Sequence, residues 1–156
     1  MMEILCENVL RVSGYHDDIV RFDERFRKGR KITERNYHFD HLYPTPHLNS
    51  DEALKWRKEN WSVEDSFFTD SFSKDAILNS DMETYYYFDT PNAAPENLIK
   101  HVSAVFNELG FMLVFSPEGN RTGKIKEYLN GELISDEDLS DEDIAYWFGD
   151  RLEESA

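Results

Sequence analysis

The sequence predicts an α+β domain with a mainly antiparallel sheet. Some segments show apolar residues alternating with polar ones, as in strands. Between them lie segments in which apolar residues recur at helical spacing. An Asn-Gly pair at residues 130–131 is typical of a two-residue β-hairpin. A chain of 156 residues, 14% of them aromatic, has the length and composition of one domain with one ordinary core.

The first 28 residues predict a strand over 3–13 and then a helix over 15–28. The helix is indicated by apolar residues at helical spacing, which are Tyr15, Ile19, Phe22 and Phe26. In the strand, alternation divides the side chains between two faces. One face carries Ile4, Cys6, Asn8, Leu10 and Val12, and the other carries Leu5 and Val9.

The next part of the chain is less regular. Residues 36–43 predict a second strand, which Pro44 and Pro46 end because two prolines so close exclude a helix. Ser50 is a suitable N-cap for a short helix over 51–60. Residues 61–80 contain several aromatic residues but no clear period, so they are predicted to form an irregular insertion.

The second half has stronger patterns. Residues 82–89 alternate as a strand, and residues 95–109 carry a broad apolar stripe that predicts a helix. Residues 111–115 predict a short buried strand, and residues 122–135 predict the hairpin. Ser140 and Asp143 form a capping box for a last helix over 141–152.

This order of elements predicts a ferredoxin-like sandwich. Two strand–helix–strand units form the antiparallel sheet with two helices packed on one face, and a C-terminal hairpin and acidic helix follow. We expect one domain over residues 1–135, with the irregular insertion at about 61–80. The acidic helix, within residues 136–156, is appended to the same domain.

Five segments resemble, in order, the YubB-type ferredoxin-like domain family, which is encoded mostly by phages, plasmids and other mobile elements. The opening strand and turn at 6–14 resemble the family's first strand. Residues 40–46 resemble the family's segment that ends in Pro-x-Pro, and residues 56–61 resemble its segment with tryptophans and an asparagine. Residues 88–91 resemble its later strand before a helix, and residues 128–132 resemble its closing hairpin. The family often continues after Asn-Trp with Gly-Thr-Lys-Trp, whereas this chain continues with Ser62 and Val63. The resemblance implies a fold and a mobile-element origin, and it implies no reaction.

The composition restricts the partners. The formal net charge of −15 repels phosphate backbones and anionic membranes, so a basic protein is the better expected partner. The single cysteine, Cys6, excludes an intramolecular disulfide. The N-terminus has no basic region followed by an apolar run, and no stretch approaches the ~20 apolar residues of a membrane span. We therefore expect a cytoplasmic protein.

His38, Asp40 and His41 are the best candidates for a metal site. On a strand, His38 and Asp40 share a face and His41 points away, so only two ligands converge. A small metal-dependent enzyme or metal-binding protein is one alternative function, against the simpler interpretation of ordinary loop histidines. No other pattern predicts a catalytic residue or a cofactor, since the carboxylates form no isolated pair and no nucleophile elbow or phosphate loop is present.

A basic stretch from Arg25 to Arg35 suggests a second alternative. Together with the aromatic strand 85–88 it fits a nucleic-acid binder, because such sheets can stack bases on aromatic side chains. No glycine–aromatic core motif of RNA-binding domains is present, and the net charge opposes the idea. The alternative interpretation is a solvated helix end, where cations are favoured.

The last thirty residues carry most of the excess charge. Residues 127–156 hold 11 acidic residues and one basic residue, a net of −10, whereas the preceding 126 residues have a net of −5. The helix in this region has an apolar stripe that either docks on the protein's own core or anchors a partner. The candidate partner-binding residues are Asp141, Glu142, Asp143, Ile144, Trp147, Phe148 and Leu152. The sequence thus favours a non-enzymatic protein-interaction module.

Overall fold

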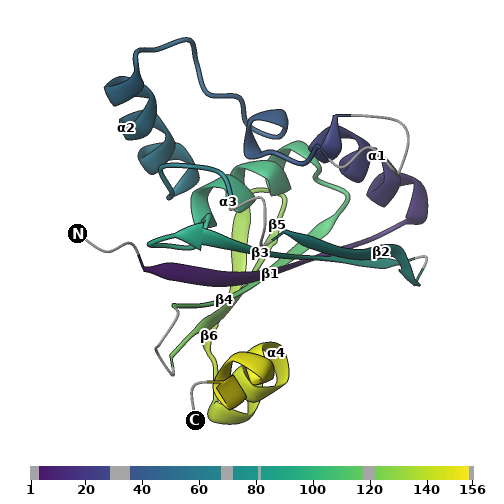
Figure 1. The fold of residues 1–156 in the computed structure, drawn as a ribbon. Coiled ribbons are helices and arrows are strands. Elements are labelled where there is room, and N and C mark those ends of the chain that lie inside the picture. The colour runs from purple at the N-terminus through teal and green to yellow at the C-terminus, as the bar shows by residue number, and fades with distance from the viewer. Residues whose placement is uncertain (1–3, 29–35, 68–71, 81, 118–121, 155–156) are drawn as a thin grey trace.

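The structure, a computed structural model, describes residues 4–28, 36–67, 72–80, 82–117 and 122–154. Within these residues, six strands form one antiparallel sheet in the order β2-β3-β1-β4-β5-β6 (Figure 1). The strands are β1 (Leu5–Ser13), β2 (Ser73–Ser80), β3 (Glu83–Pro91), β4 (Gly110–Pro117), β5 (Lys124–Leu129) and β6 (Glu132–Asp138). The predicted α+β class with an antiparallel sheet is therefore confirmed.

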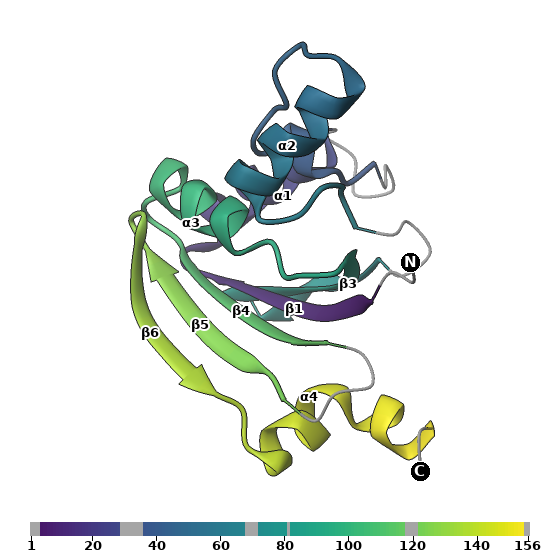
Figure 2. The same ribbon diagram turned by 90° about the vertical axis from the view of Figure 1, so that its left-hand side faces the viewer.

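Helices cover both faces of this sheet. Three of them, α1 (His16–Arg27), α2 (Ser50–Trp61) and α3 (Glu96–Val105), lie on one side, as Figure 2 shows. The fourth, α4 (Asp141–Glu154), follows β6 and lies on the opposite side. The sheet is thus the middle layer, with the two parts of the core above and below it.

The main core lies between the sheet and α1, α2 and α3. Cys6, Leu10 and Val12 of β1 are buried there, while Val9 faces the other side, as the alternation predicted. Tyr86 and Phe88 of β3 join them, and aromatic rings from α1 and the following segment fill the space beneath the helices. β1 and β3 are therefore central strands with apolar side chains on both faces.

A smaller core lies on the α4 side. It consists of Val9, Met112, Val114, Leu139, Ile144 and Phe148, with Tyr85, Tyr87, Ile125 and Trp147 packed around it. The capping box predicted for α4 is present, because Ser140 Oγ accepts from Asp143 N at 3.1 Å and Asp143 Oδ2 accepts from Ser140 N at 3.2 Å. α4 bends at Phe148, whose φ of −132° and ψ of 28° are not helical.

The predicted strand over 36–43 is wrong. His38 caps a short 3-10 turn, η1 (Phe39–His41), with its Nδ1 accepting from Asp40 N at 3.0 Å. Phe39 and Leu42 are nevertheless buried. These two residues are apolar because the turn packs against the core. A turn can bury apolar residues that do not alternate as they would in a strand.

The second strand of the sheet instead lies inside the predicted irregular insertion. β2 pairs with β3 in a register that shifts between Asp75 and Ser80. Nearby, α2 starts one residue earlier than predicted, because Asn49 rather than Ser50 supplies the cap by accepting from Glu52 N at 2.9 Å. Trp61 at the end of α2 is fully buried and donates from Nε1 to Tyr43 O at 3.0 Å.

The remaining boundaries differ from prediction by a few residues. α3 ends at Val105 instead of residue 109, because Phe106 leaves the helical conformation with a ψ of 64°. β6 extends to Asp138, so the expected division between residues 135 and 136 falls within a strand of the common sheet. Asn130 and Gly131 both have positive φ, at 51° and 78°, as a type I′ hairpin turn requires.

No helix in the described ranges has both the length and the apolar character that a membrane crossing needs.

Candidate functional site

The acidic C-terminal region forms one edge of the sheet and the helix that follows it. β6 is an edge strand, and its carboxylates lie on the outside of the molecule. The exposed acidic residues of β6 and of the first turn of α4 are Glu132, Asp136, Glu137, Asp138, Asp141, Glu142 and Asp143. We call these seven residues the acidic surface.

Two lysines of β5 neutralise part of this charge. Lys124 Nζ lies 3.2 Å from Asp136 Oδ1 and 3.5 Å from Asp138 Oδ1, and these carboxylates raise the pKa of Lys124. Lys126 Nζ lies 3.9 Å from Asp136 Oδ2 and also pairs with Glu96 of α3. The first turn of α4 carries three carboxylates in succession, which suit the positive end of a helix dipole.

The apolar stripe of α4 docks on the protein's own sheet. Ile144 is 1% exposed and Phe148 is 7% exposed, and both pack on Val9, Met112 and Val114. The candidate role of Ile144 and Phe148 as partner anchors is therefore wrong for the docked helix. Trp147 is only partly buried, and the side chain of Leu152 lies outside the described residues. Asp141, Glu142 and Asp143 remain on the surface.

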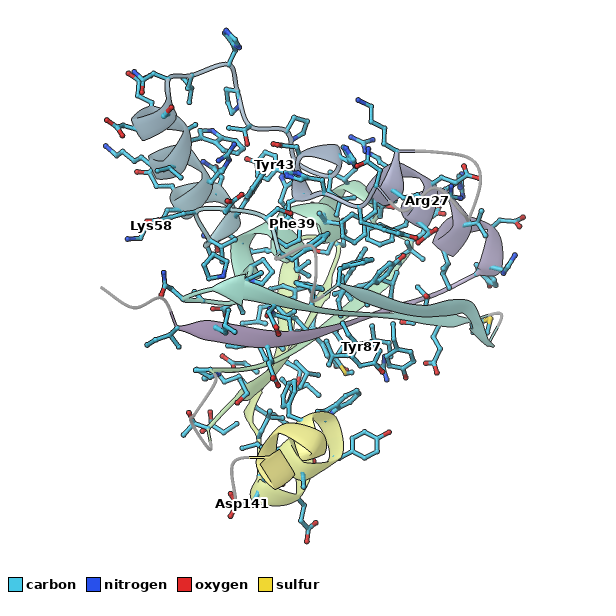
Figure 3. The ribbon with its side chains drawn as sticks, viewed as in Figure 1. Arg27, Phe39, Tyr43, Lys58, Tyr87 and Asp141 are labelled. Atoms are coloured by element: carbon cyan, nitrogen blue, oxygen red, sulfur yellow. The ribbon has the colours of Figure 1, made fainter. Side chains whose placement is uncertain are left out.

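A groove of about 330 Å³ lies beside the docked helix. Its floor comes from β1 and β3 and its wall from residues 145–149 of α4. Figure 3 shows Tyr87 projecting from the sheet toward the α4 side. The side chains that give the groove its chemical character are Glu7, Tyr87, Asp89, Tyr146 and Trp147. We call this space the α4 groove.

The strand register explains why two carboxylates meet in the α4 groove. Glu7 of β1 is paired directly with Asp89 of β3, and the same face continues through Val9 paired with Tyr87. Directly opposed side chains on neighbouring antiparallel strands have Cβ atoms about 4.5–5.5 Å apart. The two carboxylates and the Tyr87 ring therefore belong to one small area of the sheet.

The candidate metal ligands form a capped turn. Asp40 Oδ1 accepts from Thr45 N at 2.8 Å and from Thr45 Oγ1 at 2.6 Å, and His41 Nδ1 lies 2.8 Å from Phe26 O. Burial lowers the pKa of His38. Burial also opposes ionisation of Asp40, but the hydrogen bonds from Thr45, together with the nearby His38 and Arg57, outweigh it and lower the pKa of Asp40. Among the described residues, no group of three His, Cys, Asp or Glu side chains is arranged to hold a metal ion.

The predicted basic patch is divided by the fold. Arg27 is 3% exposed and donates from Nε to Asp23 Oδ2 at 2.9 Å, so it is part of the core. Arg25 donates to His41 O at 3.2 Å and, with Arg21 and Lys28, lines a groove of about 560 Å³ that also contains Glu24 and Asp40. Arg30, Lys31 and Arg35 lie outside the described residues. The described part of the patch thus has mixed charge.

The sequence did not predict the α4 groove. Glu7 and Asp89 are 82 positions apart, and only the register of β1 with β3 brings them together. The available signal was the alternation of residues 82–89, because alternate residues of a strand, such as Tyr85, Tyr87 and Asp89, share one face. It could not show that α4 would dock beside that face.

Comparison with known proteins supports the fold. No family model and no curated protein matches the sequence. Among solved structures, the chain is similar to protein api92 from Yersinia pseudotuberculosis, whose family model is DUF1281. The TM-score is 0.52 with 13% sequence identity, and the match covers 65% of this chain and 39% of that protein. At this identity the similarity concerns the α+β fold alone, over about two fifths of the length of that protein.

Proposed function

We propose that this chain is a non-enzymatic protein-interaction module of a phage or mobile element, and that its acidic surface binds a basic protein. The observation that carries the proposal is the arrangement of the acidic surface. Seven carboxylates are exposed on one edge strand and the start of the next helix, and no lysine or arginine occurs between residues 127 and 149. Clustered surface charge of one sign steers association with a partner of the opposite sign.

The mobile-element origin rests on the segments that resemble the YubB-type family, and so does the ferredoxin-like assignment. The strand order β2-β3-β1-β4, with α1 and α3 as the two crossover helices, supports that assignment because it contains two interleaved strand–helix–strand units. β5, β6 and α4 are then additions to the basic fold. The acidic surface belongs entirely to these additions, which separates the binding region from the central part of the fold.

A set of matched charge variants tests the proposal. The test variant replaces Glu132, Glu137 and Glu142 with glutamine, and the control variant replaces Glu59, Glu64 and Glu108 with glutamine. All six side chains are exposed, and both variants change the net charge by the same amount. Basic host or element proteins captured by the wild-type chain are identified and purified, and their affinity for each variant is then measured at several salt concentrations.

The test variant is expected to bind the purified partner more weakly than the control variant, with a smaller dependence on salt. Attraction between exposed charges is screened by salt, so loss of the relevant carboxylates lowers both quantities. Equal affinities for the test and control variants would contradict the proposal, because net charge alone would then account for the binding.

A further inference from the structure

We propose that the outer edge of β6 binds an extended basic segment of the partner as an additional strand of the sheet. This inference rests on the proposed function, because it identifies how the basic partner is held on the acidic surface. β6 is the last strand of the sheet, and within the described residues no other strand pairs with its outer edge (Figure 2). Six of its seven residues are exposed. Unpaired strand edges of this kind recruit extended segments of other chains.

The backbone of Asp136 and Asp138 supplies the hydrogen-bonding groups. Leu139 N donates to Gly123 O at 2.9 Å, so these two residues form a hydrogen-bonded pair just beyond the ends of β6 and β5. Hydrogen-bonded and non-hydrogen-bonded pairs alternate along two antiparallel strands. Glu137 therefore directs its N–H and C=O groups toward β5, whereas Asp136 and Asp138 direct theirs away from the sheet. These two residues offer an added strand two donors and two acceptors.

The edge has few of the features that block pairing. Edge strands are commonly protected by lysine, by proline or by bulges, and β6 contains neither lysine nor proline. Its register with β5 shifts once, at Ile134, and residues 135–138 are then paired with β5 without interruption. Ile134 is 57% exposed and Leu133 is 44% exposed, so apolar side chains adjoin the regular stretch. Residues 135–138 are thus the part of β6 that an added strand would pair with.

The charge of β6 determines which segment can occupy the edge. A second copy of β6 would place carboxylates opposite carboxylates, which disfavours pairing. A segment with lysine or arginine at alternate positions is instead attracted. Lys124 lies near Asp136 and Asp138, but Glu137 is paired with Ile125 and lies on the other face of the sheet from that lysine. A cation opposite Glu137 would therefore meet a carboxylate that Lys124 does not neutralise.

The test uses the peptide acetyl-Thr-Lys-Val-Lys-Val-Lys-Thr-amide as the probe, added to isotope-labelled full-length protein. Hydrogen exchange of single amides is followed by NMR. In the free protein the amides of Asp136 and Asp138 should exchange fast, and that of Glu137 should be protected by β5. Peptide at ten times its dissociation constant should slow exchange of the two aspartate amides about tenfold and change that of Glu137 much less. Attraction to the side chains alone would not protect backbone amides in this alternating pattern.

Two further peptides separate charge from backbone pairing on the wild-type protein. The first has glutamate in place of each lysine and is expected not to bind, because it faces the carboxylates of β6 with like charges. The second retains the lysines but carries a methyl group on every backbone nitrogen, which removes its donors. It should bind at least about tenfold more weakly than the unmodified peptide, since several hydrogen bonds are lost.

A pair of variants at Asp138 tests the same contact from the side of the protein. Asp138→Pro removes an N–H group that faces outward, and proline is tolerated on edge strands at such positions. Asp138→Asn is the matched control, because it removes the same charge and retains the N–H group. We expect Asp138→Pro to bind the lysine peptide about fivefold more weakly than Asp138→Asn, the effect of one hydrogen bond.

Equal binding of the methylated and unmodified lysine peptides, or unchanged exchange at Asp136 and Asp138, would overturn the inference, and both measurements stand even if Asp138→Pro does not fold. Sedimentation of the chain alone tests the other occupant. A dimer that Asp138→Pro dissociates and Asp138→Asn does not would mean that a second copy occupies the edge, contrary to the inference.

These outcomes are separate from those of the proposed function. If the pairing fails while the triple glutamine variant still loses its purified partner, the acidic surface binds through side chains alone and the proposed function stands. If the lysine peptide pairs with β6 but the triple glutamine variant keeps its partner, the edge accepts basic strands and the acidic surface is not the docking region.

Discussion

The hydroxyl of Tyr86 on β3 donates a hydrogen bond of 2.6 Å to Oδ1 of Asp23 on α1, and both side chains are fully buried. The same carboxylate accepts from the Tyr37 hydroxyl at 2.9 Å and from Arg27 Nε at 2.9 Å. A charged carboxylate in the core is tolerated only where hydrogen bonds and an opposite charge satisfy it. Asp23 therefore joins α1, the segment after it and the centre of the sheet.

Asp23→Asn is expected to destabilise the protein by about 3–5 kcal/mol, because it removes the negative charge that pairs with the buried guanidinium of Arg27. Tyr86→Phe should cost less, about 1.5–3 kcal/mol, because it removes one hydrogen bond to a charged group and retains the ring. Urea unfolding of both variants measures the difference. A Tyr86→Phe variant at least as unstable as Asp23→Asn would contradict the central role of the carboxylate.

Stability should fall at alkaline pH because of buried tyrosines. Burial, reinforced by the Asp23 carboxylate, raises the pKa of Tyr86 well above its ordinary value of about 10. Burial likewise raises the pKa of Tyr128 to about 12. Above pH about 10 the unfolded chain releases these protons while the folded chain keeps them, so their stabilising contribution is complete below that pH and is lost as pH rises.

Tyr86→Phe should reduce the steepness of this alkaline loss, measured as unfolding free energy in urea between pH about 9 and about 11. Tyr15→Phe, at a side chain that is 73% exposed, is the control because it removes a tyrosine without altering the core. If both variants lose stability with pH as steeply as the wild type, Tyr86 does not carry the effect.

Local patterns in the sequence were sufficient for the elements whose burial has a clear period. The alternation of residues 82–89 predicted a strand, and in β3 Tyr86 faces the main core while Tyr87 faces α4. The hairpin was predictable because Asn130 and Gly131 must adopt positive φ. In each case the signal depends on neighbouring residues alone.

Elements that depend on distant residues could not be predicted in this way. β2 is a strand through its pairing with β3, although its own residues show no alternation, since strand formation depends strongly on context. The apolar Phe39 contributed to the wrong prediction of a strand over 36–43. It is buried because it lies in a turn that the His38 side chain caps. The sequence left open whether α4 would dock, and the answer required the apolar face of the sheet that Val9, Met112 and Val114 create.

Ser140→Ala should loosen the start of α4 without affecting the main core. The hydroxyl of Ser140 accepts from Asp143 N at 3.1 Å, and loss of such a cap costs about 1 kcal/mol of helix stability. Hydrogen exchange of the α4 amides is expected to accelerate about fivefold, which corresponds to that free energy. Unchanged exchange in α4, or equal acceleration in β1, would show that the cap has no local effect.

Ile144→Ala should detach α4 from the sheet. Ile144 is 1% exposed within the small core of the α4 side, and truncation of a buried isoleucine costs about 2–5 kcal/mol. The main core lies across the sheet and does not include Ile144, so we expect the amides of α4 to lose protection from exchange while those of β1 and β3 keep most of theirs. Tyr146→Ala on the same helix is the matched control, because its side chain is 78% exposed and contributes little to docking. Equal loss of protection in α4 and the central strands would mean that the two cores unfold together, and α4 would then be as integral to the fold as β1.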